Sequence, residues 1–368
     1  MNASAYPDTS HTLTELTPAG PVLDLARWAP SGDNTQPWQF EVRDAHHIVI
    51  HGYDTRDHCV YDLDGHGSHL ALGTLLETIA IAATTQDCLA NIARRTDSPD
   101  ERPLYDVTLT PVQGIVPDPL AQAIKTRSVQ RRPMSFRRLE DLEKQTLEDA
   151  VQPDYRVLWL ETAAQKWATS RILFANAKLR LTMREAYEVH RRIIEWNARY
   201  SADRIPDRSL GLDPLTLKLM RWVMGSWERV RFFNAYLAGT WAPRIQLDLL
   251  PALACGAHFV LIAERPATTL ADYVEAGRRL QRFWLTAERL GLKLQPEVTP
   301  LIFARYLREG RRFTTQEKIL SAAAPMAGQL QSLLAAKLEQ AVFMGRIGAG
   351  NDAASRSLRK TLAQLQAT

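Results

Sequence analysis

The feature of this sequence that most constrains its fold is a polar loop, residues 30–37 (Pro-Ser-Gly-Asp-Asn-Thr-Gln-Pro), between two patterned segments. Residues 21–29 place apolar side chains at helical spacing, and residues 38–42 alternate apolar with polar side chains, as in a half-buried strand. The proline at each end limits the freedom of the loop, so little conformational entropy is lost when it binds a ligand. The sequence therefore predicts a rigid loop whose hydroxyl, amides and backbone N–H groups can meet a flat polar ligand.

The run from residue 29 to residue 38, Ala-Pro-Ser-Gly-Asp-Asn-Thr-Gln-Pro-Trp, is followed by an aromatic strand. It resembles the flavin loop of the FMN-dependent nitroreductase superfamily. The resemblance implies an α+β, nitroreductase-like fold in which Ser31, Asn34 and Gln36 hydrogen-bond the edge of the flavin ring. The alternative interpretation is a buried turn anchored by two tryptophans.

Composition sets broad limits on the class of protein. The chain has 368 residues, 45% hydrophobic and 23% charged, with a net charge of +4, which allows one large or two modest globular domains and favours an anionic ligand. Cys59, Cys88 and Cys255 form no C-x-x-C pair, which argues for a reducing compartment. No run reaches the roughly 18 apolar residues of a membrane span, and residues 1–20 lack the apolar stretch of a signal peptide. We expect a cytoplasmic protein without a membrane partner.

Helix, loop, strand, long helix and strand occur in this order twice along the chain. We expect a flexible arm at 1–20, a first half at 21–115, and a second half at 116–368 with a lid insertion at 201–244. Further helices are expected at 67–84, 117–126, 139–151, 163–182, 184–200, around 220–230, at 270–290 and over most of 296–338. Further strands are expected at 47–51, 103–111, 156–160, 257–263 and 341–346.

A single chain with two diverged halves resembles the fused, Acg-type and MoeY-like branch of the superfamily. In that branch one polypeptide imitates a homodimer whose flavin lies between subunits. The resemblance implies a pseudo-dimer around mixed sheets that binds one FMN per chain, either as a monomer or as a homodimer.

The phosphate of FMN is a dianion, and arginine forks bind such groups best. The superfamily uses an R-x-[ST]-x-R element, and Arg127-Ser128-Val129-Gln130-Arg131 resembles it, with valine in place of the central hydroxyl residue. The resemblance implies that Arg127, Ser128 and Arg131 bind the phosphate, with Arg346 after the last strand as a second contribution. A solvated basic loop is the alternative for 127–131, and a solvated helix face is the alternative for the basic tail at 356–359.

Other patterns are given simpler interpretations. Six of the nine histidines lie between residues 46 and 69, but there is no H-E-x-x-H motif, so we expect no metal. The arginines of 171–199 lack the aromatic interleaving of a nucleic-acid binder, so we expect no nucleic-acid partner. The aromatic residues of 201–244 form either core or a lid over the flavin.

The sequence thus predicts an FMN-dependent oxidoreductase that passes electrons from NADH or NADPH through flavin to a small organic acceptor. One alternative is a protein that sequesters FMN under a closed lid with little or no turnover. Another is a biosynthetic flavoenzyme that acts on one specific intermediate. The sequence names no catalytic acid or base.

Overall fold

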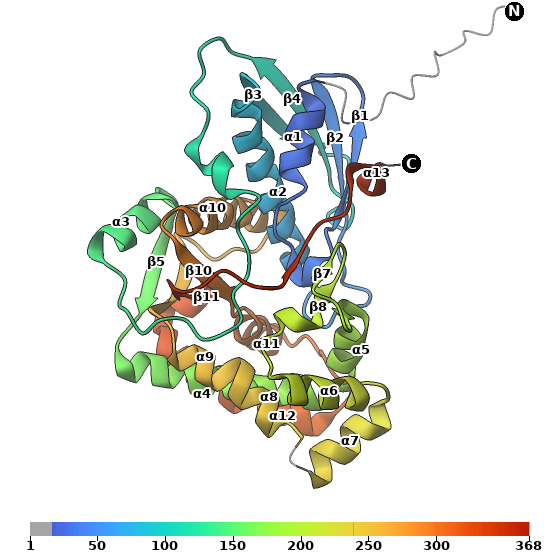
Figure 1. The fold of residues 1–368 in the computed structure, drawn as a ribbon, viewed down its shortest axis with the longest axis vertical. Helices are drawn as coiled ribbons and strands as arrows, with labels where there is room; N and C mark the ends of the chain where they lie inside the picture. Colours follow the sequence, from blue (N-terminus) through green and yellow to red (C-terminus); the bar gives the residue numbers. More distant parts are fainter. Residues whose placement is uncertain (1–16, 238, 368) are drawn as a thin grey trace, which may run out of the picture.

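The structure is a computed structural model that describes residues 17–237 and 239–367. The expected arm at 1–20 therefore lies mostly outside the described residues, and its last two residues already belong to helix α1 (Ala19–Ala26). Figure 1 shows the first half at the top of the view and the helices of the second half below it.

The first half is a four-stranded antiparallel sheet with the order β1-β2-β4-β3, packed on a central helix. In the chain, the central helix α2 comes between the second and the third strand. The elements are β1 (Trp38–Val42), β2 (His47–Gly52), α2 (His66–Thr84), β3 (Cys88–Arg94) and β4 (Leu104–Pro111).

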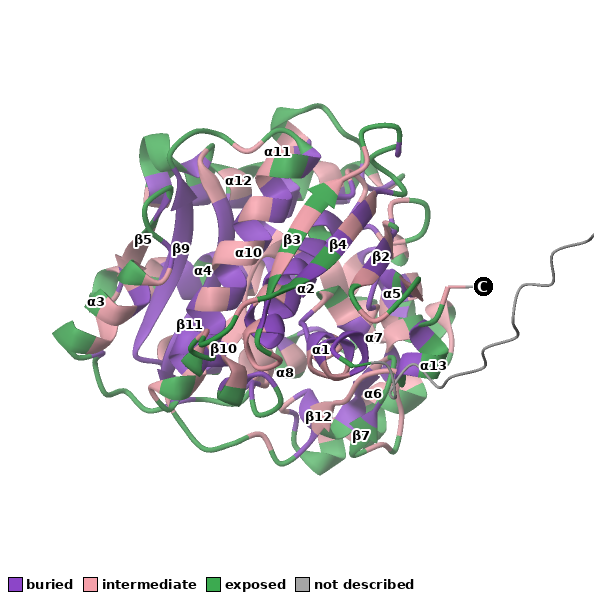
Figure 2. Ribbon diagram, turned by 90° about the horizontal axis from the view of Figure 1, so that it is seen from above, coloured by how far each residue is buried: buried purple, intermediate pink, exposed green. Residues whose placement is uncertain are grey.

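The second half repeats this plan. Its antiparallel sheet has the order β5-β9-β11-β10, so in both sheets the strands lie in the order first, second, fourth, third, with the central helix after the second strand. The elements are β5 (Tyr155–Leu160), β9 (Ala257–Ala263), α10 (Leu270–Arg289), β10 (Leu292–Pro296) and β11 (Ala341–Ala349). In Figure 2, β9 and β11 are buried along most of their length.

The two central helices cross in direct backbone contact. Gly73 is the eighth residue of α2, and Gly277 is the eighth residue of α10. A Cβ on Gly73 would lie 1.9 Å from the carbonyl oxygen of Val274, and a Cβ on Gly277 would lie 2.0 Å from that of Leu70. Each glycine therefore meets the carbonyl three residues before the other glycine, and the contact is reciprocal.

The segment that follows each sheet in the chain pairs with a strand of the other sheet. Val129, which follows the first sheet in the chain, forms a parallel bridge with Leu294 of β10. Gln366, which follows the last strand of the second sheet, forms a parallel bridge with Phe40 of β1. The C-terminal segment includes β12 (Arg356–Ser357) and α13 (Leu362–Leu365), and Figure 1 shows it running from the second sheet to the first.

The expectation of mixed sheets was wrong. Both four-stranded sheets are antiparallel, because each central helix connects two strands that are not hydrogen-bonded to each other. Parallel pairing in the described residues is confined to the two single bridges and to two small two-stranded sheets, β12-β7 and β6-β8.

The other elements cover the second sheet or connect the halves. The segments expected to be helical at 184–200 and around 220–230 differ from the structure: the first helix ends at Ile193, and the second is interrupted at Gly225 and Ser226. These elements are η2 (Pro119–Ala123), α3 (Asp141–Asp149), α4 (Ala163–Thr182), α5 (Arg184–Ile193), β6 (Ile194–Glu195), β7 (Tyr200–Ser201), β8 (Ile205–Pro206), η3 (Asp207–Ser209), α6 (Pro214–Val223), α7 (Trp227–Tyr236), α8 (Trp241–Arg244), a π-helical turn (Ile245–Leu249), α9 (Leu250–Leu253), α11 (Thr299–Arg308), α12 (Glu317–Leu334) and η5 (Ala335–Leu338).

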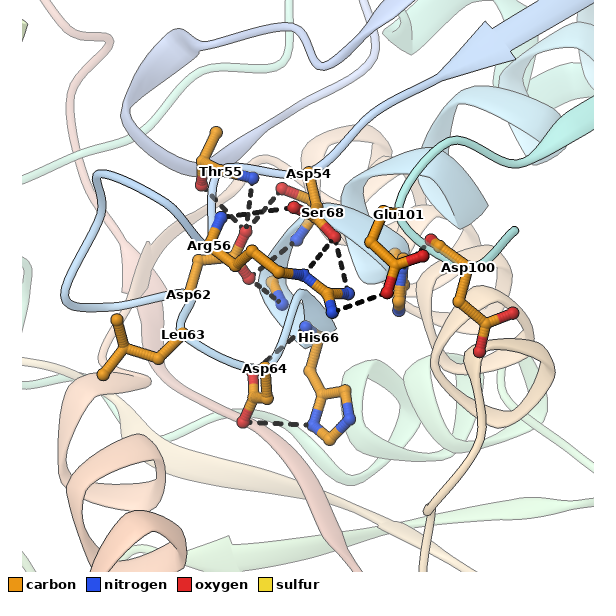
Figure 3. Close-up of polar contacts among 12 residues, drawn as sticks. Asp54, Thr55, Arg56, Asp62, Leu63, Asp64, His66, Ser68, Asp100 and Glu101 are labelled. Atoms are coloured by element: carbon orange, nitrogen blue, oxygen red, sulfur yellow. Dashed lines mark hydrogen bonds and ion pairs between the residues drawn. The ribbon is translucent and has the colours of Figure 1, made fainter. Parts of the chain in front are cut away.

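The loop between β2 and α2 is folded around the buried carboxylate of Asp62 (Figure 3). This carboxylate accepts hydrogen bonds from the hydroxyls of Thr55 (2.8 Å) and Ser68 (2.6 Å) and from the backbone N–H of Gly67 (2.7 Å). It thereby satisfies N–H groups at the start of α2 that have no partner within the helix.

By length and composition alone, one helical stretch, Glu317–Leu338, could cross a membrane, with a mean hydropathy of 1.2. The sequence prediction of no such stretch therefore needs this qualification. Several of its side chains, among them Ala323, Met326 and Leu330, pack in a core cluster with α4 and α11. A core helix of a soluble domain gives the same composition.

The helix crossing predicts a sharp contrast between glycines. Gly73→Ala should destabilise the fold by roughly 3 kcal/mol or more, because the new methyl overlaps a backbone carbonyl that cannot move without parting the helices. Gly328→Ala, in α12 with open space around it, should be neutral or stabilise by up to about 1 kcal/mol through helix propensity. Urea unfolding of both variants measures the contrast, and equal effects would contradict the close crossing.

Candidate functional site

The loop predicted to bind a ligand has an unusual backbone. Asp33, Asn34 and Gln36 have positive φ angles of 52°, 62° and 52°, and these are three of the six non-glycine residues with positive φ in the described chain. Left-handed conformations cost side-chain-bearing residues on the order of 1 kcal/mol each, and they cluster at functional sites. The loop must therefore be held by strong surrounding contacts.

Those contacts come from two segments of the second half. Gln36 is fully buried; its side-chain N–H groups donate to the carbonyl of Ala202 (2.9 Å), and its oxygen accepts from the backbone N–H of Lys360 (2.9 Å). Asn34 donates to the carbonyls of Ala202 and Arg204, at 3.2 Å each. We call residues 200–209 the strap, because they cross over the loop in this way.

The three residues predicted to bind the flavin ring thus differ in whether their side-chain atoms are free to meet a ligand. The side chain of Gln36 is used by the protein itself, and its role as a ligand contact stays a prediction that this geometry does not favour. The Ser31 hydroxyl accepts from the backbone N–H of Gln36 (2.9 Å) and keeps its own proton to donate. The side-chain oxygen of Asn34 is buried and has no partner in the described chain, so it is a free acceptor.

Three arginines gather beside the end of α1. Arg127 is buried under the ring of Trp284, 4.6 Å from its centroid, and donates to the carbonyl of Trp28 (3.1 Å). Arg359 donates to the carbonyl of Ala29 (2.9 Å). Arg356 lies over the ring of Trp28 and donates to the carbonyl of Arg127.

No carboxylate in the described residues forms an ion pair with Arg127, Arg356 or Arg359, and the Nε atoms of Arg127 and Arg356 are buried there without a partner. Burial and the neighbouring Arg356 lower the pKa of Arg127 to about 9, against the opposing charge of Glu288, and burial with its arginine neighbours lowers that of Arg359 well below the ordinary value. Glu288 itself pairs with Lys293 (3.3 Å), and the C-terminus of α1 offers only about half a negative charge. The cluster therefore has the charge and the free donors to bind an anion.

The other predicted phosphate residues lie elsewhere. Arg346 is buried, lies 3.6 Å from Glu297, and donates to the carbonyls of Gln130 and Arg131 (3.3 and 2.7 Å). It therefore shapes the turn that carries Arg131 and does not join the arginine cluster. Ser128 is half-buried, and no side-chain hydrogen bond is formed by it in the described chain.

A second polar group surrounds the loop from the opposite side. Burial raises the pKa of Asp33 to about 6, against the opposing charges of Arg131 and Arg180, and it raises that of Asp248 to about 6 as well. Asp33, Arg131 and Asp248 nevertheless keep intermediate solvent exposure. Asp33 and Asp248 both feel the charge of Arg180, so the strained loop borders a group of interacting charges.

Two hollows of the described chain contain none of the predicted site residues. One is a pocket of about 180 Å³ between α4, α5 and the helices α6–α8. The other is an open polar cleft of about 420 Å³ beside His66, Arg308 and Arg311. His66 itself stacks on Tyr273 at 3.8 Å, and burial lowers its pKa to about 3, so it is neutral there. In the described residues, no three metal-ligating side chains come together.

Sequence reasoning missed Trp284 and undervalued Arg356 and Arg359. Trp284 lies on the inner face of a long amphipathic helix, where the sequence pattern gives no indication of contact with Arg127. The tail arginines were given a solvated helix as their alternative, yet they lie in extended backbone against the first half. The sequence does not show that the C-terminal segment runs from the second sheet to the first. The contact of Arg356 and Arg359 with the first half therefore could not be inferred from it.

Comparison with known proteins gives few matches. No family model matches the chain, and no curated protein matches it. Among solved structures it is similar to a nitroreductase-like family protein from Bacillus cereus, with 12% identity over 68% of this chain and 96% of that one. It is also similar to the FMN-dependent nitroreductase NfnB from Mycobacterium smegmatis in complex with NADPH, with 15% identity over 68% of this chain and 99% of that one. Both TM-scores are 0.34, too low to establish a shared fold.

The raised pKa of Asp33 predicts a pH-dependent effect of its replacement. The folded protein holds this proton more tightly than the unfolded chain, so Asp33 lowers stability as pH rises from about 4 to about 6. Asp33→Asn should therefore gain roughly 1 kcal/mol in stability at pH 8 relative to its effect at pH 4, after allowance for the partial exposure of the side chain.

Thermal or urea unfolding of both proteins at the two pH values measures this difference. Asparagine tolerates a positive φ better than aspartate does, but that gain is the same at both pH values and cancels in the comparison. An identical effect at pH 4 and pH 8 would show that Asp33 is solvated as an ordinary aspartate.

Proposed function

We propose that this protein is an FMN-dependent oxidoreductase of the nitroreductase type, in which the two halves of one chain act as a pseudo-dimer with FMN at their junction. The observation that carries the proposal is the arginine cluster: a buried Arg127 lies beside half-buried Arg356 and Arg359, and none of the three is ion-paired to a carboxylate in the described residues. A phosphate dianion supplies the charge and the hydrogen-bond acceptors that these guanidinium groups lack.

The pseudo-dimer part of the proposal is supported by topology. Two sheets with the same strand order, two glycines with reciprocal contacts, and a segment after each sheet that pairs with the other sheet are the pattern expected of two related units around a local two-fold axis. The arginine cluster joins Arg127, next to the first half, with the C-terminal segment of the second. The ligand loop of the first half lies beside it.

The residues of the chain would hold FMN from its two ends. Arg127, Arg356 and Arg359 would bind the phosphate. Ser31 retains a hydroxyl proton and Asn34 a buried free acceptor, which suits the donor and acceptor edge of a flavin ring. FMN, when bound, supplies the two-electron chemistry that side chains cannot perform.

The chain's own contribution is binding, orientation and the control of water and protons. The strap closes the loop on one side through the carbonyls of Ala202 and Arg204, which limits access of water. Burial raises the pKa of Asp33 to about 6, so this side chain of the loop can hold or release a proton close to neutral pH.

A second candidate function is sequestration of FMN with little or no turnover. The observation that favours it is again the strap, which uses the amides of both Asn34 and Gln36 to stay closed over the loop. A strap that does not open would keep NADH or NADPH from reaching a bound flavin. The two functions share one binding site and differ only in access.

The phosphate assignment predicts a selective loss of affinity. Arg127→Ala and Arg356→Ala should each weaken FMN binding roughly 30-fold, since a charge-assisted hydrogen bond to phosphate contributes about 2 kcal/mol. Affinity for riboflavin, which has no phosphate, should change much less. Fluorescence titration with both flavins measures the two affinities.

Arg138→Ala provides the matched control, because Arg138 is an exposed arginine outside the cluster and should leave both affinities unchanged. If wild-type protein binds neither flavin, the whole proposal is wrong. If Arg127→Ala weakens FMN and riboflavin equally, the arginine supports the fold of the site and does not bind phosphate.

Turnover separates the two candidate functions. We expect that anaerobic addition of NADH or NADPH to the FMN-loaded protein bleaches the flavin absorbance at a rate that depends on nicotinamide concentration. Flavin that is reduced by dithionite but not by either nicotinamide would instead favour sequestration. Weakening the strap with Ser357→Ala should then speed reduction, because the hydroxyl that donates to the carbonyl of Arg204 (2.9 Å) is lost while the proposed flavin contacts stay in place.

A further inference from the structure

The helices α6, α7 and α8 expose large apolar side chains to an extent seen nowhere else in the described chain. Leu215 and Tyr236 keep 77% and 76% of their surface exposed, and α6 contains no fully buried residue. The exposed large apolar residues of this segment are Leu215, Leu219, Trp222, Phe232, Tyr236, Leu237 and Trp241. We call them the lid patch. Similar residues elsewhere, such as Phe136 and Leu142, are scattered.

The lid patch follows the helical period. Leu215, Leu219 and Trp222 lie at positions i, i+4 and i+7 of α6, and Phe232 and Tyr236 lie at i and i+4 of α7. Such spacing forms one continuous stripe on a helix. On these two helices the stripe faces outward.

The inner side of the same helices is apolar as well. Met220, Val223, Met224 and Phe233 line the pocket of about 180 Å³ against α4 and α5, and Leu219 and Leu237 of the lid patch line it as well. The helices thus already have an apolar face toward the core, and the members of the patch that do not line this pocket form a second apolar face. Figure 1 shows these helices at the bottom of the view, at the far end of the molecule from the first sheet. A second partner is needed for the outer face.

Basic residues border the lid patch. Lys218, Arg221, Arg229 and Arg231 are all exposed. The exposed acidic residues of the two helices are placed at the helix starts, where Asp213 caps α6 and Glu228 lies in the first turn of α7. Beyond their first turns, both helices thus expose aromatic and aliphatic side chains together with positive charge.

We propose that the lid patch docks on an anionic membrane surface. Helices that lie in a lipid interface combine an apolar face that carries tryptophan or phenylalanine with lysine and arginine that meet the headgroups. A second copy of the chain fits less well, because a two-fold contact through this patch would bring the same basic residues of both copies together. The proposal departs from the sequence-based expectation of no membrane partner, which stays a prediction.

Vesicle flotation tests the proposal with the full-length protein. Wild-type protein should float with vesicles of phosphatidylcholine and phosphatidylglycerol and much less with phosphatidylcholine alone. Phe232→Ser combined with Tyr236→Ser should lower the partition coefficient at least roughly tenfold, since two inserting apolar side chains are lost. Lys218→Glu combined with Arg231→Glu should lower the partition coefficient by roughly tenfold or more. Each basic residue near an anionic surface contributes a factor of about ten or less to that coefficient, and the two substitutions also reverse the charge.

Matched controls lie outside the patch. Phe136→Ser removes an equally exposed aromatic residue, and Arg138→Glu with Arg289→Glu reverses two exposed charges of other elements; these variants should float like wild type. Thermal unfolding confirms that the lid variants are folded. Vesicle binding requires no flavin, so its outcome is independent of the proposed oxidoreductase function.

Three results would overturn the proposal. They are the absence of wild-type protein from the floating fraction at low salt, flotation of the lid variants equal to that of wild type, and an equal loss of flotation in the control variants. A fourth concerns the rival occupant: if analytical ultracentrifugation finds a wild-type dimer that Phe232→Ser with Tyr236→Ser converts to a monomer, the patch is an interface between copies of this chain.

Discussion

The crossing of α2 and α10 at two bare glycines is the contact on which the rest of the structure depends. It lets two backbones touch, and the side chains around it then connect the halves: Glu77 of α2 accepts from Arg278 and Arg282 of α10, each at 2.9 Å. The same crossing positions the candidate site. Thr74, next to Gly73, donates to the carbonyl of Pro30 at the start of the ligand loop (2.8 Å), and Trp284 of α10 supports Arg127. Sheets, loop and arginine cluster are thus placed by one pair of helices.

Several features of the candidate site lower the stability of the ligand-free protein. They are the positive φ angles of the loop, the raised pKa of Asp33, and the like charges of Arg127, Arg356 and Arg359. Contacts from the strap and the C-terminal segment hold the loop in this conformation. Protein folds accept such groups where a ligand compensates them. A surface turn and a solvated basic loop, the two simpler interpretations, would require neither a buried Arg127 nor three left-handed residues in one short loop.

The sequence predicted the two halves, both central helices and the loop between helix and strand, because each depends on a local hydrophobic period. It did not predict the close crossing of α2 and α10, because a glycine such as Gly73 within a helix indicates only a lower helix propensity. It missed β3 and β10, whose alternation is weak: β3 buries little beyond Cys88 and carries small alanines, and β10 contains Lys293 and Pro296. Of the site, the motif indicated Arg127, which lies in the arginine cluster, and Arg346, which lies 3.6 Å from Glu297. Position after a strand does not reveal whether a side chain turns to a ligand or to Glu297, and both phosphate roles stay predictions.

The insertion at 201–244 has two ends with different partners, and this gives it a means of connecting the site with the surface. Its first residues form the strap that holds Asn34 and Gln36, and Ser209 at the end of the strap lies 3.4 Å from Arg131. Only four residues separate Ser209 from Pro214, where α6 and the lid patch begin. With no fully buried residue in α6, little core packing resists its movement. A shift of α6 against a membrane would therefore reach the strap through a short connection, and access to the ligand loop would change with the position of the lid.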